Sequence, residues 1–207
     1  MGLIADYIGQ LSLLDALTTN SGPPPSAGWA AGSFSTGTSQ LLVSGNRMGR
    51  SAAGWGSGYW GTGFGQYEGM RLKCEVAGDF SFDICTKDEG GANWDSYECN
   101  YTASTHKFDI WVITNGATGA SLANSTALTL AGGEDLAFMY INDALVFGYN
   151  NAGTWTDLVT ATGVTTLTAG GHVGAWVNGT TAKFTGLYGG TLTPIATGRR
   201  GMMMDCG

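Results

Sequence analysis

Carboxylate side chains are the first candidates for chemistry in this sequence, because pairs of carboxylates hydrolyse glycosidic bonds. When such a pair lies on one strand, both groups share a face only if their spacing is even. Asp95 and Glu98 are three residues apart, and Glu68 and Glu75 are seven apart, so each pair is expected on opposite faces. The sequence therefore predicts no glycoside hydrolase site, and we expect that the protein is not an enzyme.

Nucleophilic catalysis lacks its usual motifs as well. The sequence contains two histidines, His106 and His172, and no G-x-S-x-G sequence that would present a serine nucleophile. A lone histidine near the start of a strand is typical of a surface or capping residue. We therefore expect no catalytic residues of the Ser/His/Asp kind.

One acidic loop could hold a metal ion. Asp88, Glu89, Asn93 and Asp95 lie close together in the sequence and offer the oxygen ligands that calcium prefers. The alternative is a solvated acidic loop without a metal. Calcium is the one cofactor that the sequence suggests, and otherwise we expect none.

Aromatic side chains are the best candidates for ligand contact. Residues 54–65 interleave glycines with large rings, so that a pliable backbone presents those rings. Such rings could stack on sugars or anchor a protein partner, or they could be buried in the core or in an interface. The candidate contact residues are Trp55, Tyr59, Trp60, Phe64 and Trp94.

Charge and hydropathy exclude two classes of partner. The net charge is −7, with nine basic residues spread over 207, whereas a nucleic-acid surface needs clustered Lys and Arg. Arg199-Arg200 is the one basic pair. No run approaches the roughly 18 apolar residues that span a bilayer, and the first residues lack the basic region of a secretory signal. We expect neither nucleic-acid binding nor membrane insertion.

The elements that would position these residues are short β-strands. The chain contains 35 glycines and only 12% charged residues, a composition typical of all-β sandwiches with glycine-rich turns. The stretch 171–190 predicts a β-hairpin whose two strands are joined at Asn178-Gly179, with Phe184 as a core anchor. Its first strand alternates, with Val173, Ala175 and Val177 on one face and His172, Gly174 and Trp176 on the other. Residues 3–17 predict an amphipathic helix, or else a first strand in their second half.

The four cysteines show no CxxC spacing and therefore no zinc-site motif. Strand alternation places Cys74 with apolar neighbours and Cys85 on the face of Asp83. We expect buried free thiols, with a disulfide among Cys74, Cys85 and Cys99 as the alternative.

Several motifs occur in an order that resembles a known family. They are, along the chain, GWAAGSF, LLVSGNRM, YWGTGFGQYEGMRLKCEV, DSYECNYT, KFDIWVITNGAT, GEDLAFMYINDALVFGYNNAGTWTDLVTA and GGHVGAWVNGTTAKFTGLYGG. Together they resemble the concanavalin A-like (laminin G-like) jelly-roll sandwiches, in particular those of tailed-bacteriophage virion proteins. The resemblance covers roughly residues 28–190. Thr185 departs from it, because many relatives carry Asp at that position.

The resemblance implies an all-β jelly-roll sandwich over residues 28–190. An N-terminal extension would cover residues 1–27, with a possible helix and a Pro-rich loop, and a C-terminal tail would cover 191–207. The implied function is a virion structural protein, a capsid or tail decoration or adsorption module that binds other virion proteins as a homo-oligomer and contacts host-surface glycans. Docking on the virion would use Arg199, Arg200, Met202, Met203 and Met204. The alternative is a free carbohydrate-binding lectin without catalytic activity.

Overall fold

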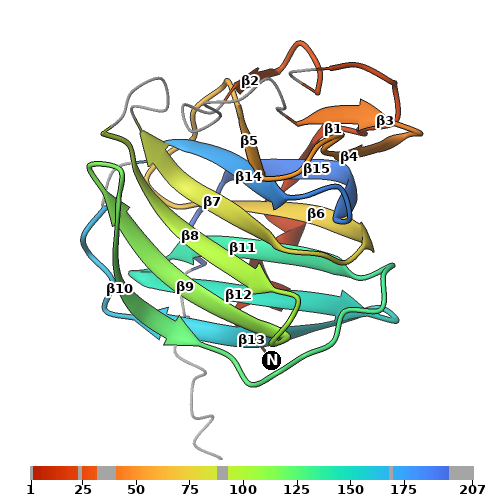
Figure 1. The fold of residues 1–207 in the computed structure, drawn as a ribbon. Coiled ribbons are helices and arrows are strands. Elements are labelled where there is room, and N and C mark those ends of the chain that lie inside the picture. The colour runs from red at the N-terminus through yellow and green to blue at the C-terminus, as the bar shows by residue number, and fades with distance from the viewer. Residues whose placement is uncertain (1, 23–24, 32–40, 88–92, 168–169, 196–207) are drawn as a thin grey trace, which may run out of the picture.

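Two antiparallel β-sheets lie face to face and form the body of the molecule (Figure 1). The structure is a computed structural model, and it describes residues 2–22, 25–31, 41–87, 93–167 and 170–195. Helical structure within these residues is confined to the N-terminal α1 (Leu3–Tyr7) and η1 (Ile8–Gln10). The predicted all-β sandwich is therefore confirmed.

Sheet A has the strand order β13-β12-β11-β6-β15-β4-β3, and β1 pairs with β15 beside this path. Its strands are β1 (Ser12–Asp15), β3 (Leu42–Ser44), β4 (Arg47–Gly49), β6 (Glu68–Val76), β11 (Asp135–Ile141), β12 (Ala144–Asn151), β13 (Thr154–Thr162) and β15 (Lys183–Thr191). Sheet B has the order β10-β9-β8-β7-β14-β5-β2. Its strands are β2 (Trp29–Ala31), β5 (Trp55–Trp60), β7 (Phe80–Lys87), β8 (Asp95–Thr102), β9 (Lys107–Thr114), β10 (Ala117–Asn124) and β14 (His172–Asn178).

Aromatic rings from both sheets fill the space between them. Phe108 on β9 stacks on Phe147 of β12 with ring centroids 4.5 Å apart, and Phe80 on β7 meets Phe184 of β15 at 5.0 Å. All four rings are fully buried. Because each ring removes a large apolar area from water, these contacts hold the sheets together, and the predicted role of Phe184 as a core anchor is confirmed.

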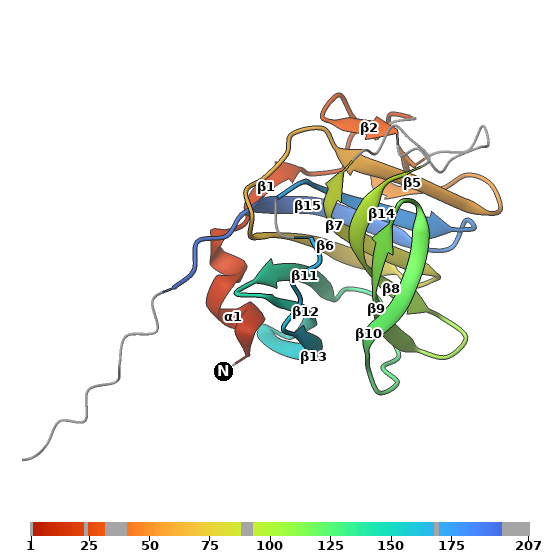
Figure 2. The same ribbon diagram turned by 90° about the vertical axis from the view of Figure 1, so that its left-hand side faces the viewer.

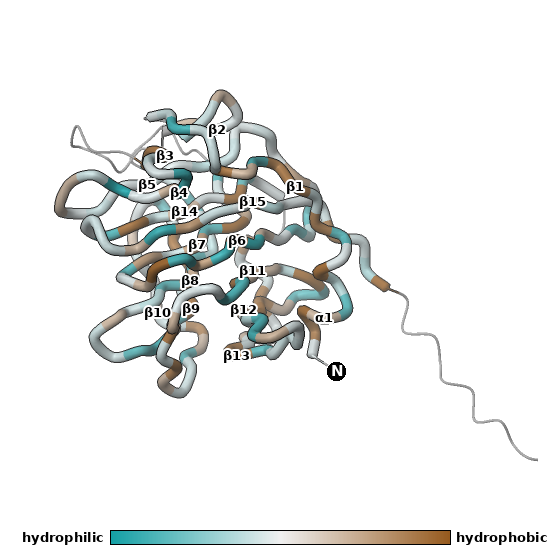
Figure 3. Tube along the Cα trace, turned by 90° about the vertical axis from the view of Figure 1, so that its right-hand side faces the viewer, coloured by the Kyte–Doolittle hydropathy of each residue, from teal (hydrophilic) through white to brown (hydrophobic). Residues whose placement is uncertain are grey.

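The N-terminal segment covers the outer face of sheet A. Figure 2 shows α1 beside β11 to β13, on the side away from sheet B. Ile4 and Tyr7 are buried there against Met139 and Val146. Both alternatives for residues 3–17 are therefore realised in part, since a helix forms first and β1 follows. Figure 3 shows the hydrophobic residues of α1 and β1 in brown.

The two strands predicted around Asn178-Gly179 form, but they do not pair with each other. β14 belongs to sheet B and β15 to sheet A, so the turn carries the chain from one sheet to the other. The backbone N–H of Asn178 donates to the carbonyl of Asp79, and Gly179 has a φ of +71°. The prediction of a hairpin was wrong, because alternation fixes which faces are apolar but not which strands pair.

Cys74, Cys85 and Cys99 are buried and free, so the thiol interpretation holds for these three. Cys85 does not lie on the face of Asp83, as alternation predicted, but belongs to the core cluster. Its φ of +57° and the register shift between Ile84 and Lys87 mark a bulge that changes the alternation.

Candidate functional site

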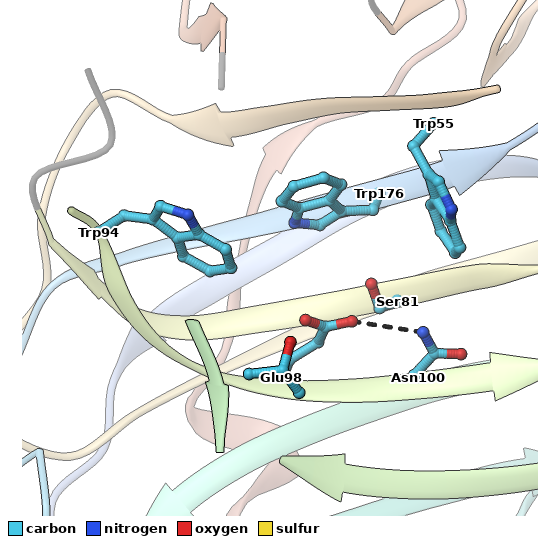
Figure 4. A pocket seen from close by; sticks show the side chains of 7 residues that line it. Trp55, Ser81, Trp94, Glu98, Asn100 and Trp176 are labelled. Atoms are coloured by element: carbon cyan, nitrogen blue, oxygen red, sulfur yellow. Dashed lines mark hydrogen bonds between the residues drawn. The ribbon is translucent and has the colours of Figure 1, made fainter. Parts of the chain in front are cut away.

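A hollow of about 250 Å³ lies on the outer face of sheet B (Figure 4). Three indole rings line one side of it, and polar side chains line the other. Its lining residues are Trp55, Ser81, Trp94, Glu98, Asn100, Thr118 and Trp176. These side chains come from β5, β7, β8, β10, β14 and the segment that precedes β8, so the hollow exists only in the folded sheet.

Strand alternation explains why these residues face outward. On β7, Phe80 and Phe82 point into the core, so Ser81 between them points outward. On β8, the buried Tyr97 and Cys99 leave Glu98 on the outer face. The alternation predicted for β14 is also confirmed, because Val173, Ala175 and Val177 are fully buried and Trp176 faces outward.

The strand register brings distant residues side by side on this face. One row across the sheet runs Ser57, Trp176, Ser81, Asn100 and Asp109, from β5 to β9. The next row runs Tyr59, Gly174, Asp83, Glu98 and Trp111. Directly opposite residues on antiparallel strands have neighbouring side chains, so each row is a set of contacts.

The three tryptophans of the hollow form a continuous row of rings. The Trp55 and Trp176 centroids are 6.3 Å apart with planes at 76°, and those of Trp94 and Trp176 are 5.7 Å apart at 39°. Trp55 keeps 41% of its surface exposed, whereas Trp94 is buried to 5%. The row therefore offers solvent an apolar surface whose outer ring is freely accessible.

Asp83 and Glu98 form a pair of carboxyl groups beside this row. They lie directly opposite each other on β7 and β8. Asp83 is only 3% exposed, and its Oδ1 has no hydrogen-bond partner among the described residues. Glu98 is half-buried and lines the hollow, where it accepts a hydrogen bond from Asn100 Nδ2 at 3.3 Å (Figure 4).

Burial raises the pKa values of both carboxyl groups. Burial raises the pKa of Asp83 well above its ordinary value, the charge of Glu98 raises it further, and a hydrogen bond with Trp176 acts in the opposite direction. Burial also raises the pKa of Glu98, against the hydrogen bond from Asn100 that lowers it. Two carboxyl groups that face each other in a poorly solvated site titrate as a unit.

The predicted aromatic residues are divided between the hollow and the core. Trp55 and Trp94 line the hollow. Tyr59 lies on the same face, where its ring centroid is 5.4 Å from that of His172. Trp60 points the other way and meets Trp29 edge-on at 6.4 Å. Phe64 is partly buried and packs against the core.

The predicted calcium loop is described only in part. Asp95 accepts a hydrogen bond from the backbone N–H of Asn115 at 2.8 Å, so it stabilises the neighbouring β-turn. Asp88 and Glu89 lie outside the described residues, as do Arg199, Arg200, Met202, Met203 and Met204. The part of the chain that the structure describes contains no group of three or more His, Cys, Asp or Glu side chains able to hold a metal ion.

Four side chains of this face were missed from the sequence: Asp83, Glu98 as its partner, Trp111 and Trp176. Asp83 and Glu98 are 15 residues apart in the sequence, and the even spacing that pairs carboxylates within one strand does not apply to them. The signal was present, because β7 and β8 form a hairpin and alternation places both carboxyl groups on its polar face. Alternation likewise places Trp176 on the polar face of the strand predicted at residues 172–178, which is a signal for a residue of this site.

A second hollow, of about 350 Å³, lies on the outer face of sheet A and has a different character. Arg71 lies there with its guanidinium carbon 3.7 Å from the centroid of the Tyr188 ring, and it forms an ion pair of 3.9 Å with Asp135. Lys73 also lines it, near Leu13, which is 53% exposed. The second hollow is therefore lined by basic side chains, whereas no basic side chain lines the hollow on sheet B.

Solved structures with the same fold include carbohydrate-binding domains. The exoplasmic/lumenal domain of VIP36 in its metal-free form matches with a TM-score of 0.65 and 12% identity, over 89% of this chain and 95% of that one. The carbohydrate-binding module CBM66 from Bacillus subtilis matches with a TM-score of 0.57 and 15% identity, over 80% and 94%. A legume lectin-like domain from Entamoeba histolytica matches with a TM-score of 0.61 and 9% identity, over 88% and 100%.

These likenesses show that the chain has the concanavalin A-like jelly-roll fold, as predicted. Identities this low speak for the fold alone. No protein-family model matches the chain, and neither does any curated protein sequence. Among the described residues, no helix has the length and apolar character needed to cross a membrane.

Proposed function

We propose that this protein is a carbohydrate-binding module, and that the hollow on sheet B is its binding site. The observation that carries the proposal is the row of Trp55, Trp176 and Trp94 beside the polar side chains of Glu98 and Asn100. Sugars present apolar C–H faces and a rim of hydroxyl groups. The hollow offers a complementary surface for each.

Each side of the hollow has a physical role. The indole rings supply a flat apolar surface that loses little conformational freedom when a ligand covers it. The carboxylate of Glu98 accepts hydrogen bonds from sugar hydroxyls, and the amide of Asn100 both donates and accepts. A hollow of about 250 Å³ is slightly smaller than the ligand-pocket range of roughly 300–1,000 Å³ and suits one or two sugar rings of a longer chain.

The matched structures support this proposal through what their names record. One of them is a carbohydrate-binding module, another a legume lectin-like domain, and VIP36 has been solved with Ca²⁺ and Man3GlcNAc bound. None of these matches is described as an enzyme. We therefore propose binding without catalysis, in agreement with the absence of catalytic motifs in the sequence.

Replacing the exposed indole tests the proposal. We expect the wild-type protein to bind one or more oligosaccharides on a glycan array, and Trp55→Ala to lower the affinity at least about tenfold, or ~1.4 kcal/mol. The same loss is expected for Trp176→Ala, because its ring lies in the middle of the row.

Trp155→Ala provides the matched control, because Trp155 is half-buried on the outer face of sheet A and far from the hollow in the sheet order. Its affinity should equal that of the wild type, with circular dichroism confirming that all variants fold. Absence of any bound glycan, or equal binding by the Trp55 and Trp155 variants, would refute the proposal.

The virion role stays a separate proposal. It rests on the resemblance of the motifs to phage virion sandwiches, and its predicted docking residues lie outside the described residues. The matches reported above favour the lectin alternative over a virion role. A virion location and a homo-oligomer are compatible with glycan binding on sheet B, but glycan binding requires neither of them.

A further inference from the structure

We propose that the hollow on sheet B selects amino sugars. The protonated amino group of the sugar would be held by the carboxylate of Glu98 between the indole rings. This inference rests on the proposed carbohydrate-binding function and names its ligand class. It follows from the charge of the hollow, from the carboxyl pair at its base and from the rings around that pair.

The charge of the hollow favours cations. Its lining contains the carboxyl group of Glu98 and no Lys, Arg or His. On the described strands of sheet B the basic residues lie only at strand ends, namely Lys87 at the end of β7, Lys107 at the start of β9 and His172 at the start of β14. A uronic or sialic acid would find no cation to pair with at this site, whereas an ammonium group would find a carboxylate.

The carboxyl pair needs a cation or a proton to be stable. Asp83 and Glu98 face each other across β7 and β8. Asp83 is only 3% exposed, and its Oδ1 has no hydrogen-bond partner among the described residues. Two adjacent carboxylates in such a site repel each other, so the empty site keeps a proton. A bound ammonium group supplies the same positive charge together with three hydrogen-bond donors, and can therefore replace that proton.

Aromatic rings surround the position that the amine would occupy. Trp111 lies directly opposite Glu98 on β9, and Trp176 hydrogen-bonds to Asp83 from β14. A cation near an indole face is stabilised by roughly 0.5–2 kcal/mol. Gly174, opposite Asp83 on β14, contributes no side chain beside the pair.

Other titratable groups of the neighbouring strands do not lie directly opposite the pair. Tyr59 on β5 lies in the same row beyond Gly174, and Asp109 on β9 faces Asn100. The remaining outward or terminal groups lie at strand ends, namely Lys87, Asp95, Lys107 and His172. No described side chain on β10 is titratable. The pair is therefore the group whose protonation an incoming amine would change.

Two oligosaccharides with the same backbone provide the test. Isothermal titration calorimetry of the whole protein at about pH 6, where an amine of pKa about 8 is charged, would compare the β-1,4-linked glucosamine tetramer with its fully N-acetylated form. We expect the glucosamine tetramer to bind at least about tenfold more tightly. Titrations in two buffers of different ionisation enthalpy should show release of a proton for the amine ligand alone.

Glu98→Gln should abolish the preference for the glucosamine tetramer and the proton release, because the amide carries no charge, so that the two tetramers bind with similar affinity. Glu75→Gln, on the outer face of sheet A, is the matched control and should change nothing. Equal affinity for both tetramers, or a preference that survives in Glu98→Gln, would overturn the amino-sugar inference. If both tetramers fail to bind while Trp55-dependent binding of another neutral glycan is found, the inference fails and the proposed function stands.

Discussion

Glu68 is a fully buried carboxyl group that joins the two sheets. It lies on β6 of sheet A and accepts hydrogen bonds from the backbone N–H groups of Cys85, on β7, and Gly171, which precedes β14. The Gly171 bond is 2.9 Å long. Burial raises the pKa of Glu68 to about 7, although the two backbone hydrogen bonds lower it. Glu68 thus stabilises the bulge at Cys85 and the entrance to β14.

This raised pKa makes the stability depend on pH. In the unfolded chain Glu68 has its ordinary pKa near 4.5, so between that value and about 7 the native state holds a proton that the unfolded state has lost. The free energy of unfolding should therefore fall as pH rises through this window, by at most on the order of 3 kcal/mol from Glu68. Urea unfolding at about pH 5 and about pH 7.5 measures the slope.

In Glu68→Gln this slope should become smaller, because an amide does not titrate. It should not vanish, since the raised pKa values of Asp83 and Glu98 act in the same direction. The variant should also be less stable at acid pH by about 1–3 kcal/mol, because Gln offers a single acceptor oxygen to two backbone donors. An unchanged slope in Glu68→Gln would show that this carboxyl group does not titrate in the predicted window.

Single residues of the site were predictable only where they stood out by type. Trp55 and Trp94 were found because they are large rings in polar or glycine-rich surroundings. Asp83 and Glu98 were missed as a pair, because their approach depends on how β7 and β8 pair. Types of residue can be recognised one at a time, but a pair across two strands needs the register.

At the scale of elements, α1 is a short helix whose N-terminus is capped by a side chain from strand β13. The carboxylate of Asp157 on β13 accepts hydrogen bonds from the backbone N–H groups of Leu3 at 2.5 Å and Ile4 at 3.1 Å. These N–H groups have no partner within the helix, and a carboxylate is favoured at this end of a helix. The cap holds Ile4 and Tyr7 over sheet A.

Asp157→Ala should therefore lower the free energy of unfolding by about 1–2 kcal/mol. Asp157→Asn should lose less, because its amide oxygen still accepts one of the two hydrogen bonds. Urea unfolding monitored by circular dichroism provides the comparison, with the wild type as reference. Equal midpoints for all three proteins would mean that α1 does not depend on this cap.

Elements with a strong apolar alternation were predictable, and those without it were not. The strands around Phe82, Ile110 and Val177 were identified because each alternates buried and outward residues. β10 was missed, because it is an edge strand made of small and polar residues that are mostly exposed. The pairing of β14 with sheet B and β15 with sheet A was also beyond the sequence, since it depends on long-range contacts.

At the scale of the whole molecule, the two outer faces of the sandwich carry different side chains. Sheet A is covered by α1 on part of its outer face and carries the hollow lined by Arg71 and Lys73. Sheet B exposes the row of indoles and the carboxyl pair. The fold class was predictable from composition and motif order, but the assignment of a binding face required the three-dimensional register.

The seven tryptophans of the chain allow the central claim to be tested in a single measurement. A two-dimensional ¹H–¹⁵N spectrum of the indole N–H groups would be recorded with increasing amounts of the oligosaccharide that binds best on the array. Binding in the hollow should shift the signals of Trp55, Trp94 and Trp176 and leave unchanged those of Trp29 and Trp60, which pack edge-on against each other, and of Trp155 on sheet A. Shifts confined to Trp155, or no shift in the three indoles of the hollow, would contradict binding at this site.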